Sequence, residues 1–196
     1  MTYTQRGKLI VFEGIDGCGK STHARILAER IGAVLIGFPA RTTPIGTLLD
    51  SYLRGNIQLD PRCAHLLFCA NRWELTQYLK DVLDSGQNVV CDRYTISGAV
   101  YAHINGIDRE WACAPEMGLA PADFTLYLER PIIENSSTRI ERFESLDMQW
   151  AARCEFEKYA RKFAARIDTR PPIDIVAAQI YSVCVDRLVL QSYLAS

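Results

Sequence analysis

Short apolar runs alternate along the chain with longer segments in which apolar residues recur every three or four positions. The first run, Leu9–Phe12, is followed by a glycine-rich turn, and residues 21–31 then show helical spacing up to Gly32. Residues 33–38 form a second apolar run, which Pro39 closes. This order predicts a strand, a loop, a helix and a second strand.

Helix start signals occupy the next part of the chain. Thr43-Pro44 combines an N-cap residue with proline at the first helical position, and predicts a helix that ends near Gly55. Asp60-Pro61 repeats the signal and predicts one helix that runs to about Ser85. Further buried strands are predicted at Val89–Cys91, which leads into Asp92, and at Phe124–Leu128.

The last third of the sequence is predicted to be mostly helical. Helices are expected near 132–141, 146–163 and 173–194, with a weak strand near Ile167. Strands that alternate with helices are typical of a parallel sheet covered on both faces, whose ligands bind at the carboxyl ends of the strands. We therefore expect an α/β fold with three layers, in which helices flank a parallel sheet of about five strands, built as a single domain over residues 1–196.

Composition narrows the range of partners. The 196 residues carry 22 Lys and Arg against 23 Asp and Glu, so a net charge of -1 gives no overall attraction to nucleic acid or anionic lipid. Seven scattered cysteines without a Cys-x-x-Cys pair favour reduced thiols over disulfides or a zinc site. The first apolar run is too short for a signal sequence or a spanning helix. We expect a cytosolic or nuclear protein that binds neither nucleic acid nor membrane.

The glycine-rich turn carries the strongest chemical signal. Residues 14–21 match the phosphate-loop pattern G-x-x-x-x-G-K-[ST] and lie between a predicted strand and a predicted helix, as that motif requires. Backbone N–H groups of such a loop surround phosphates, Lys20 pairs with the β and γ oxygens, and Ser21 offers a hydroxyl to Mg²⁺. The expected nucleotide-binding residues are Gly14, Asp16, Gly17, Cys18, Gly19, Lys20, Ser21 and Thr22.

A phosphate loop alone does not fix the reaction, because GTPases and motor ATPases share it. The Asn-Lys-x-Asp guanine signature does not occur in the sequence, which disfavours a GTPase-type switch. Asp92 and Arg93 end an apolar strand, where the carboxylate can hold Mg²⁺ through water and the guanidinium can reach a phosphate in the same crevice. The alternative for this pair is an aspartate that caps the next helix beside a surface arginine.

Three further motifs accompany the loop: Phe38-Pro39-Ala40-Arg41, residues 66–74 with the sequence LLFCANRWE, and the Asp92-Arg93-Tyr94 strand end followed by Ser97-Gly98. Together they resemble the thymidylate kinases of the P-loop nucleoside monophosphate kinase superfamily, closely up to about Tyr101 and recognisably up to Glu144. The resemblance implies transfer of the ATP γ-phosphoryl group to dTMP with Mg²⁺, and a homodimer formed through helices that include the Asp60–Ser85 segment. A deoxynucleoside kinase or another pyrimidine monophosphate kinase is the alternative enzyme.

The resemblance also implies roles in acceptor binding. Phe68 stacks on thymine, Arg72 donates to its O4, and Arg41 and Arg93 hold the acceptor phosphate. Taken singly, Phe68 fits a core position, and Arg72 could pair with Glu74 or Asp81. Asp16 contacts the deoxyribose 3′-hydroxyl and Tyr101, which could equally be a core aromatic, closes around the sugar. The expected acceptor residues also include Phe38, Pro39, Ser97, Gly98 and Phe143.

The segment at about 133–145 resembles the family's lid, with Phe143 in place of a tyrosine. Eukaryotic members carry an arginine at the position of Gly17, whereas bacterial members have glycine there and supply arginines from the lid. Arg139 and Arg142 are therefore the candidates for the missing cation, with a solvated amphipathic helix as the alternative. We expect Lys20, Asp92, Arg93 and Arg139 to be catalytic. In the family the adenine lies near a loop that here contains Thr169 and Arg170.

Overall fold

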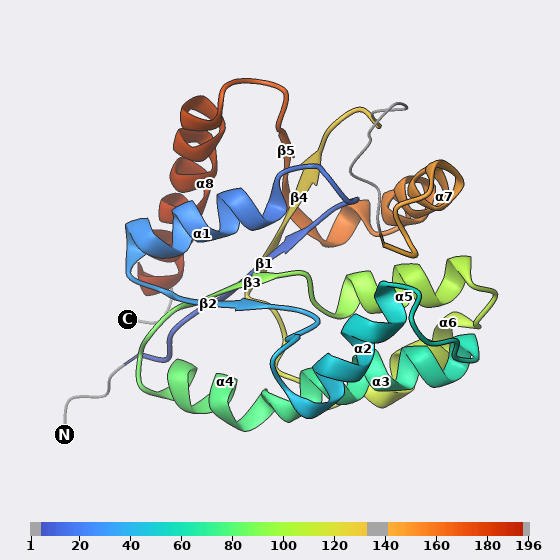
Figure 1. The fold of residues 1–196 in the computed structure, drawn as a ribbon. Helices are drawn as coiled ribbons and strands as arrows, with labels where there is room; N and C mark the ends of the chain where they lie inside the picture. Colours follow the sequence, from blue (N-terminus) through green and yellow to red (C-terminus); the bar gives the residue numbers. More distant parts are fainter. Residues whose placement is uncertain (1–4, 133–140, 194–196) are drawn as a thin grey trace.

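A computed structural model describes residues 5–132 and 141–193 and is built on one five-stranded sheet (Figure 1). All strand pairs are parallel, in the order β2-β3-β1-β4-β5. At the centre, Val11 pairs with Cys91 on one side and with Thr125 on the other. The strands are β1 (Leu9–Glu13), β2 (Val34–Gly37), β3 (Val89–Asp92), β4 (Phe124–Glu129) and β5 (Phe163–Asp168).

Helices cover both faces of this sheet, as Figure 1 shows. Successive residues of β1 point to opposite faces, because side chains alternate along a strand. Ile10 and Phe12 pack with α1 (Lys20–Ile31) and α8 (Ile173–Tyr193), whereas Leu9 and Val11 pack with α4 (Thr76–Asp84). Every residue of β1 is buried. The three-layer α/β fold predicted from the sequence is thereby confirmed.

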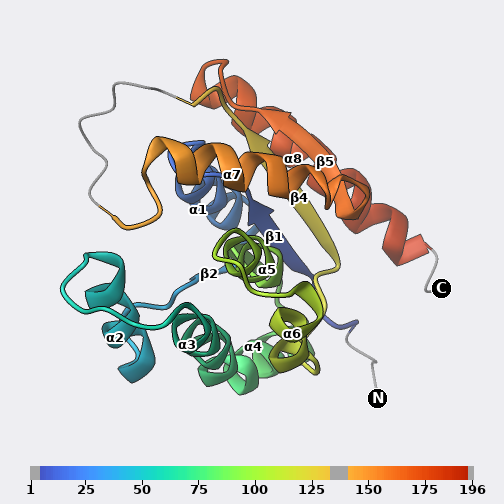
Figure 2. The same cartoon turned by 90° about the vertical axis from the view of Figure 1, so that its right-hand side faces the viewer.

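The remaining helices stand at the carboxyl end of the strands, and Figure 2 shows α5 and α7 side by side there. They are α2 (Pro44–Leu53), α3 (Pro61–Glu74), α5 (Thr95–Ile104), α6 (Arg109–Cys113) and α7 (Leu146–Glu157), with 3-10 turns at Ala114–Glu116 and Ala160–Lys162. Two of the predicted starts are confirmed in detail. The Thr43 hydroxyl accepts from the Gly46 N–H at 3.0 Å, and the Asp60 carboxylate accepts from the Arg62 N–H at 2.9 Å.

The single helix predicted from Asp60 to Ser85 is two helices, α3 and α4. The break falls at Leu75, whose N–H bonds to the Arg72 carbonyl at 3.3 Å, one residue short of the α-helical spacing. The Thr76 hydroxyl donates to the same carbonyl at 3.2 Å. This side-chain bond competes with the helical backbone pattern, which is why the helix changes direction at a position without glycine or proline.

The helix predicted over 146–163 ends at Glu157, and the residues after it form the 3-10 turn and then β5. The weak strand expected near Ile167 is therefore a full edge strand that pairs with β4 from Phe163 to Asp168. The final helix is confirmed as far as Tyr193. The short helix expected near 132–141 falls almost entirely outside the described residues.

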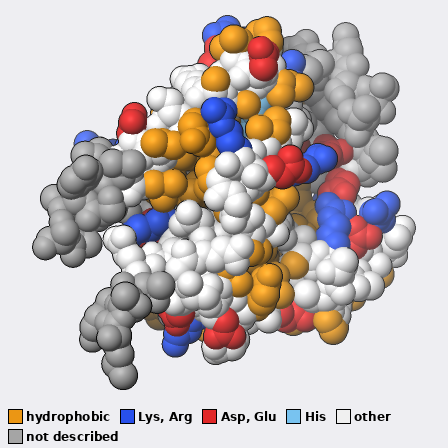
Figure 3. Space-filling model, turned by 90° about the vertical axis from the view of Figure 1, so that its left-hand side faces the viewer, with side chains coloured by type: hydrophobic (Ala, Val, Ile, Leu, Met, Phe, Trp, Pro, Cys, Tyr) orange, Lys and Arg blue, Asp and Glu red, His pale blue; other side chains and the backbone are white. Residues whose placement is uncertain are grey.

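Charge is mixed on the one face of the molecule that Figure 3 draws. On that face, Lys and Arg side chains lie among Asp and Glu side chains, in keeping with the net charge of -1. In the described part of the chain, no helix is both long enough and apolar enough to cross a membrane.

Candidate active site

The phosphate loop joins β1 to α1 in a turn that only glycine permits. Gly14 has a φ of 148°, and a Cβ placed there would lie 2.5 Å from the carbonyl oxygen of Leu128 on the neighbouring strand. Gly19 is in the left-handed region at φ 89° and is the N-cap of α1. Lys20 is 5% exposed and its Nζ donates to the Ile15 carbonyl at 2.6 Å. The loop therefore presents its N–H groups and an ammonium group to one site.

Ser21 and Asp92 meet beside this loop, although 71 residues separate them. The Ser21 hydroxyl donates to Asp92 Oδ2 at 2.5 Å. The other oxygen, Oδ1, is buried and has no hydrogen-bond partner among the described residues. Tyr94, not Asp92, is the N-cap of α5, so the alternative role of Asp92 as a helix cap is wrong. A hydroxyl and a carboxylate with a free oxygen are ligands suited to a hard divalent cation.

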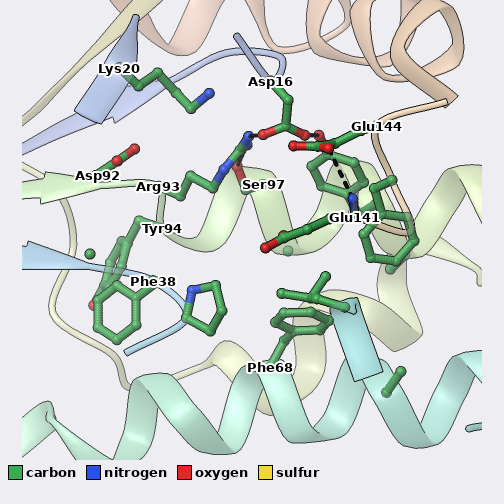
Figure 4. Close-up of a pocket in the computed structure, with 18 of the residues that line it drawn as sticks. Asp16, Lys20, Phe38, Phe68, Asp92, Arg93, Tyr94, Ser97, Glu141 and Glu144 are labelled. Atoms are coloured by element: carbon green, nitrogen blue, oxygen red, sulfur yellow. Dashed lines mark hydrogen bonds and ion pairs between the residues drawn. The ribbon is translucent and has the colours of Figure 1, made fainter. Parts of the chain in front are cut away.

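A cavity of about 650 Å³ extends from the phosphate loop to α3, and Figure 4 shows its labelled side chains pointing into it. Most of the residues predicted from the sequence line it: Asp16, Gly17, Gly19, Lys20, Ser21, Thr22, Phe38, Pro39, Arg41, Phe68, Arg72, Asp92, Arg93, Ser97, Gly98, Tyr101 and Phe143. Gly14, Cys18, Thr169 and Arg170 do not line it, and Arg139 lies outside the described residues.

Arg93 turns back from the end of β3 into the cavity. Its φ of 69° lies in the left-handed region, which costs a non-glycine residue about 1–3 kcal/mol. In this conformation its guanidinium donates to the Gly14 carbonyl at 3.0 Å, to the Ser97 hydroxyl at 3.1 Å and to Asp16 at 2.5 Å. Arg93 is thus tied to both the loop and α5, and it is not the surface arginine of the alternative interpretation.

Asp16 stays ionised because of its neighbours. Burial alone would raise the pKa of Asp16, but the charges of Arg93 and Lys20 outweigh that effect and hold the pKa below its usual value. Its second oxygen accepts from the Tyr101 hydroxyl at 3.3 Å. The Tyr101 ring in turn lies 5.1 Å from the ring of Phe143 in the lid segment. Tyr101 is therefore a cavity residue with a polar partner, and Phe143 closes the same end of the cavity.

Residues of α3 line the end of the cavity that lies away from the phosphate loop. Phe68 is only partly buried and presents its ring to the cavity, as Figure 4 shows, so it is not a core residue. Arg72 pairs with neither Glu74 nor Asp81. Its Nε donates to Glu116 at 2.9 Å and its Nη2 donates to the other oxygen of the same carboxylate. No described residue accepts a hydrogen bond from Nη1 of Arg72, which is left for a ligand.

Close packing fixes the position of Arg72. A Cβ added at Gly98 would lie 2.6 Å from Nη2 of Arg72, so α5 must carry glycine there for the guanidinium to pass. Cys69 donates to Glu116 at 3.1 Å, and burial followed by the Glu116 charge raises the pKa of the thiol to about 12. His65, Cys69 and Glu116 come close enough to hold a metal ion, but Arg72 already balances the carboxylate. This cluster positions Arg72.

Two residues of the LLFCANRWE motif that were not among the expected site residues hold the loop that carries Arg41. The amide of Asn71, fully buried, accepts from the Ala40 N–H at 2.7 Å and donates to the Thr43 hydroxyl at 2.8 Å. Glu74 accepts from Asn71 at 2.9 Å and from Thr43 at 2.6 Å. Within the cavity, Arg41 pairs with Asp50 of α2 and with Glu141 of the lid segment.

Comparison with known proteins decides the family. The thymidylate kinase family model matches residues 12–180. A thymidylate kinase of Schizosaccharomyces pombe is 36% identical over 171 residues, which cover 83% of this chain and 81% of the relative. One of Dictyostelium discoideum is 40% identical over 158 residues, which cover 76% and 71%. The solved structure of the Candida albicans thymidylate kinase matches with a TM-score of 0.81 at 32% identity, covering 91% of each chain.

The chain belongs to the thymidylate kinase family. It is a phosphotransferase that converts ATP and dTMP to ADP and dTDP. The family match supports this activity over a deoxynucleoside kinase, another pyrimidine monophosphate kinase or a GTPase-type switch. The resemblance drawn from the sequence motifs is confirmed.

The lid segment of this thymidylate kinase is only partly described. Arg142, one of its two candidate cations, points away from the cavity toward α2 and the residues after it. It donates to the carbonyls of Tyr52 and Ile57 at 3.3 Å and to the side-chain oxygen of Gln58 at 2.8 Å. These bonds tie Arg142 to the segment after α2, and Arg139, the other candidate, lies outside the described residues.

The loop after β5 is hydrogen-bonded to the phosphate loop through Thr169. Thr169 is buried, and its hydroxyl donates to the Cys18 carbonyl at 2.8 Å and to the Glu129 carbonyl at 3.1 Å. Arg170 is exposed and pairs with Asp168. Of the two residues predicted near the adenine, Thr169 contacts the phosphate loop, and Arg170 contacts neither that loop nor the cavity.

Proposed function

We propose that ATP binds on the phosphate loop and dTMP at the α3 end of the same cavity, with the two phosphates facing each other between Lys20 and Arg93. The observation that carries this arrangement is the single cavity that joins the loop to Phe68 and Arg72. Arg41 and Arg93 lie between its two ends and suit the acceptor phosphate. The dTMP phosphate oxygen forms the new bond to Pγ as the bond to the bridging oxygen breaks, and ADP leaves with that oxygen.

We propose Mg²⁺ as the cofactor, held by Ser21 and, through water, by Asp92. The free Oδ1 of Asp92 and its neighbouring hydroxyl fit such an ion. When bound, Mg²⁺ would neutralise charge on the β and γ oxygens. Lys20 and the loop N–H groups orient those oxygens, Arg93 bridges donor and acceptor sides, and Arg139 is proposed as the lid cation. Turnover of dTMP with MgATP, compared with a panel of nucleosides and other monophosphates, tests the whole assignment.

Base selection can be tested at α3. Replacing Phe68 with alanine should weaken dTMP binding roughly 5- to 150-fold, because stacking on an aromatic ring is worth about 1–3 kcal/mol. The same loss should apply to dCMP, since stacking does not depend on base identity. Replacing Arg72 with alanine should instead narrow the ratio of kcat/KM between dTMP and dCMP, because the donor that faces O4 is lost. Steady-state kinetics with both acceptors measures these changes.

The control for Arg72→Ala is a double variant that also removes the charge of its partner, Glu116. In Arg72→Ala the Glu116 carboxylate stays buried without a counter-ion, so the variant could lose stability as well as selectivity. The double variant Arg72→Ala/Glu116→Gln removes that charge and should show the same narrowed ratio. Equal losses for dTMP and dCMP in both variants would show that Arg72 does not read the base.

We also propose a homodimer that pairs through α3, as the resemblance implies. Two large apolar side chains of that helix, Leu66 and Trp73, are exposed in the single chain. Leu66→Glu should halve the mass measured by analytical ultracentrifugation at micromolar concentration, because a charge would be buried in the interface. Leu35→Glu on β2 is the matched control, since Leu66 and Leu35 are 45% and 44% exposed. A wild-type monomer, or a dimer disrupted by Leu35→Glu alone, contradicts this interface.

A reducing compartment, the cytosol or nucleus, is proposed on the basis of the thiols. All seven cysteines are free. Four of them are buried, and burial raises the pKa of Cys91 and Cys184, which keeps these thiols protonated and unreactive.

A further inference from the structure

Among the described residues, five Lys and Arg side chains line the cavity, and four of them already have partners. Lys20 bonds to a backbone carbonyl, while Arg41, Arg72 and Arg93 each pair with a carboxylate. The fifth is Arg130, an exposed residue that directly follows β4. Within residues 5–132 and 141–193, nothing accepts a hydrogen bond from Arg130 or forms an ion pair with it. Its charge is therefore available to a ligand.

The end of β4 places Arg130 next to the phosphate loop. The Leu128 carbonyl lies 2.5 Å from where Gly14 would carry a Cβ, so strand and loop are in direct contact. One residue later, the Glu129 carbonyl accepts from the Thr169 hydroxyl, which also donates to the Cys18 carbonyl. Thr169 thus links the residue before Arg130 to the middle of the loop. The backbone of Arg130 starts from a fixed point beside the loop rather than from the lid.

The loop leaves room for a cation at Gly17. Gly17 lines the same cavity as Arg130, and a Cβ added at Gly17 would meet nothing within 4 Å. The terminal phosphoryl group carries negative charge on three oxygens, and Lys20 is the one described Lys or Arg of the loop. A second cation in this open space would neutralise the negative charge of the phosphoryl oxygens that Lys20 alone does not neutralise.

We propose that Arg130 is a catalytic residue that contacts the γ-phosphoryl group of ATP during transfer. This inference rests on the proposed position of ATP on the phosphate loop. The guanidinium can donate two parallel N–H groups to two γ oxygens, which a lysine cannot do. Because Arg130 has no carboxylate partner in the described chain, no ion pair must break before it meets the phosphate. The bond to Pγ forms and breaks as in the proposed transfer, with no added reactant.

Arg130→Ala and Arg130→Lys test the proposal against Arg161→Ala, which removes an exposed arginine from the 3-10 turn before β5. Loss of a cation that acts on the moving group should lower the kcat of Arg130→Ala about 10²-fold, with the KM for dTMP unchanged. Arg130→Lys should retain part of the rate. Arg161→Ala should match the wild type, and thermal unfolding should show all three variants folded.

Comparing the binding of ATP and ADP shows which phosphate group Arg130 contacts. Arg130→Ala should weaken binding of ATP, measured by calorimetry without acceptor, and leave binding of ADP unchanged, because ADP lacks the γ-phosphoryl group. Equal weakening of ATP and ADP would overturn the proposal, since it would place Arg130 on another part of the nucleotide. A kcat within twofold of the wild type would overturn it too, and a 10²-fold loss in Arg139→Ala would then assign the cation to the lid.

The proposed position of ATP can be tested independently of the role of Arg130. If Lys20→Met binds ATP as tightly as the wild type, the nucleotide does not occupy the phosphate loop, whatever Arg130→Ala does. If Lys20→Met loses ATP while Arg130→Ala keeps normal binding and rate, the loop assignment stands and the assignment of Arg130 is wrong.

Discussion

Replacing Lys20 with methionine is expected to lower kcat for dTDP formation by about 10³-fold and to leave the fold intact. Lys20 is 5% exposed, but its described hydrogen bonds go to the Ile15 carbonyl and the Cys18 sulfur, both in its own loop. Methionine keeps the aliphatic chain and removes the charge that we propose faces the γ-phosphoryl group. A coupled assay for ADP measures the rate, and the thermal midpoint should shift by no more than about 4 °C.

Lys80→Met on α4 is the matched control for Lys20. Lys80 is exposed and does not line the cavity, so the same change there should leave both rate and stability unaltered. Should Lys20→Met turn over within tenfold of the wild type, the phosphate loop would not be the donor site.

Arg93→Ala is expected to lose both activity and stability. The rate should fall about 10³-fold, because the group that bridges the donor and acceptor sides is removed. The free energy of unfolding should fall by about 2 kcal/mol, because Asp16 loses the partner that keeps its pKa low while it remains partly buried. Chemical denaturation and steady-state kinetics on the same protein preparations measure the two effects.

Two companion variants separate the effects at Arg93. Arg93→Gly should be as inactive as Arg93→Ala but about 1 kcal/mol more stable, because glycine adopts a φ of 69° without strain. Arg93→Ala/Asp16→Asn should regain stability, since no unpaired charge remains, and should stay inactive. An active Arg93→Gly would show that the guanidinium is not needed for transfer.

Much of this site could be predicted because its signals are local. The phosphate loop depends on glycine and lysine spacing over eight residues, and the strand and helix around it follow from short-range patterns. The helix starts at Thr43 and Asp60 are equally local, since each cap bonds an N–H two or three residues away. Features of this kind depend only on residues that are close together in the sequence.

The rest depends on residues far apart in the chain. Glu116 holds Arg72 across 44 positions, and no spacing rule connects an arginine of one helix with a glutamate of a later turn. Arg142 resembled a catalytic residue by its place in the lid, yet its bonds to the carbonyls after α2 form only in the folded chain. No sequence motif pointed to Arg130, because its position beside the phosphate loop follows from the pairing of β4 with β1.

The strand order has a consequence for how this enzyme could change in evolution. β2 and β3 lie on one side of β1, and β4 and β5 lie on the other. Most of the described residues that line the proposed acceptor end of the cavity therefore come from one uninterrupted stretch, from Gly37 to Ile107, whereas the phosphate loop precedes this stretch and Arg130 follows it. Recombination at both ends of this stretch could give the kinase a new acceptor and keep its phosphate loop, provided that the incoming stretch carries an aspartate at the position of Asp92.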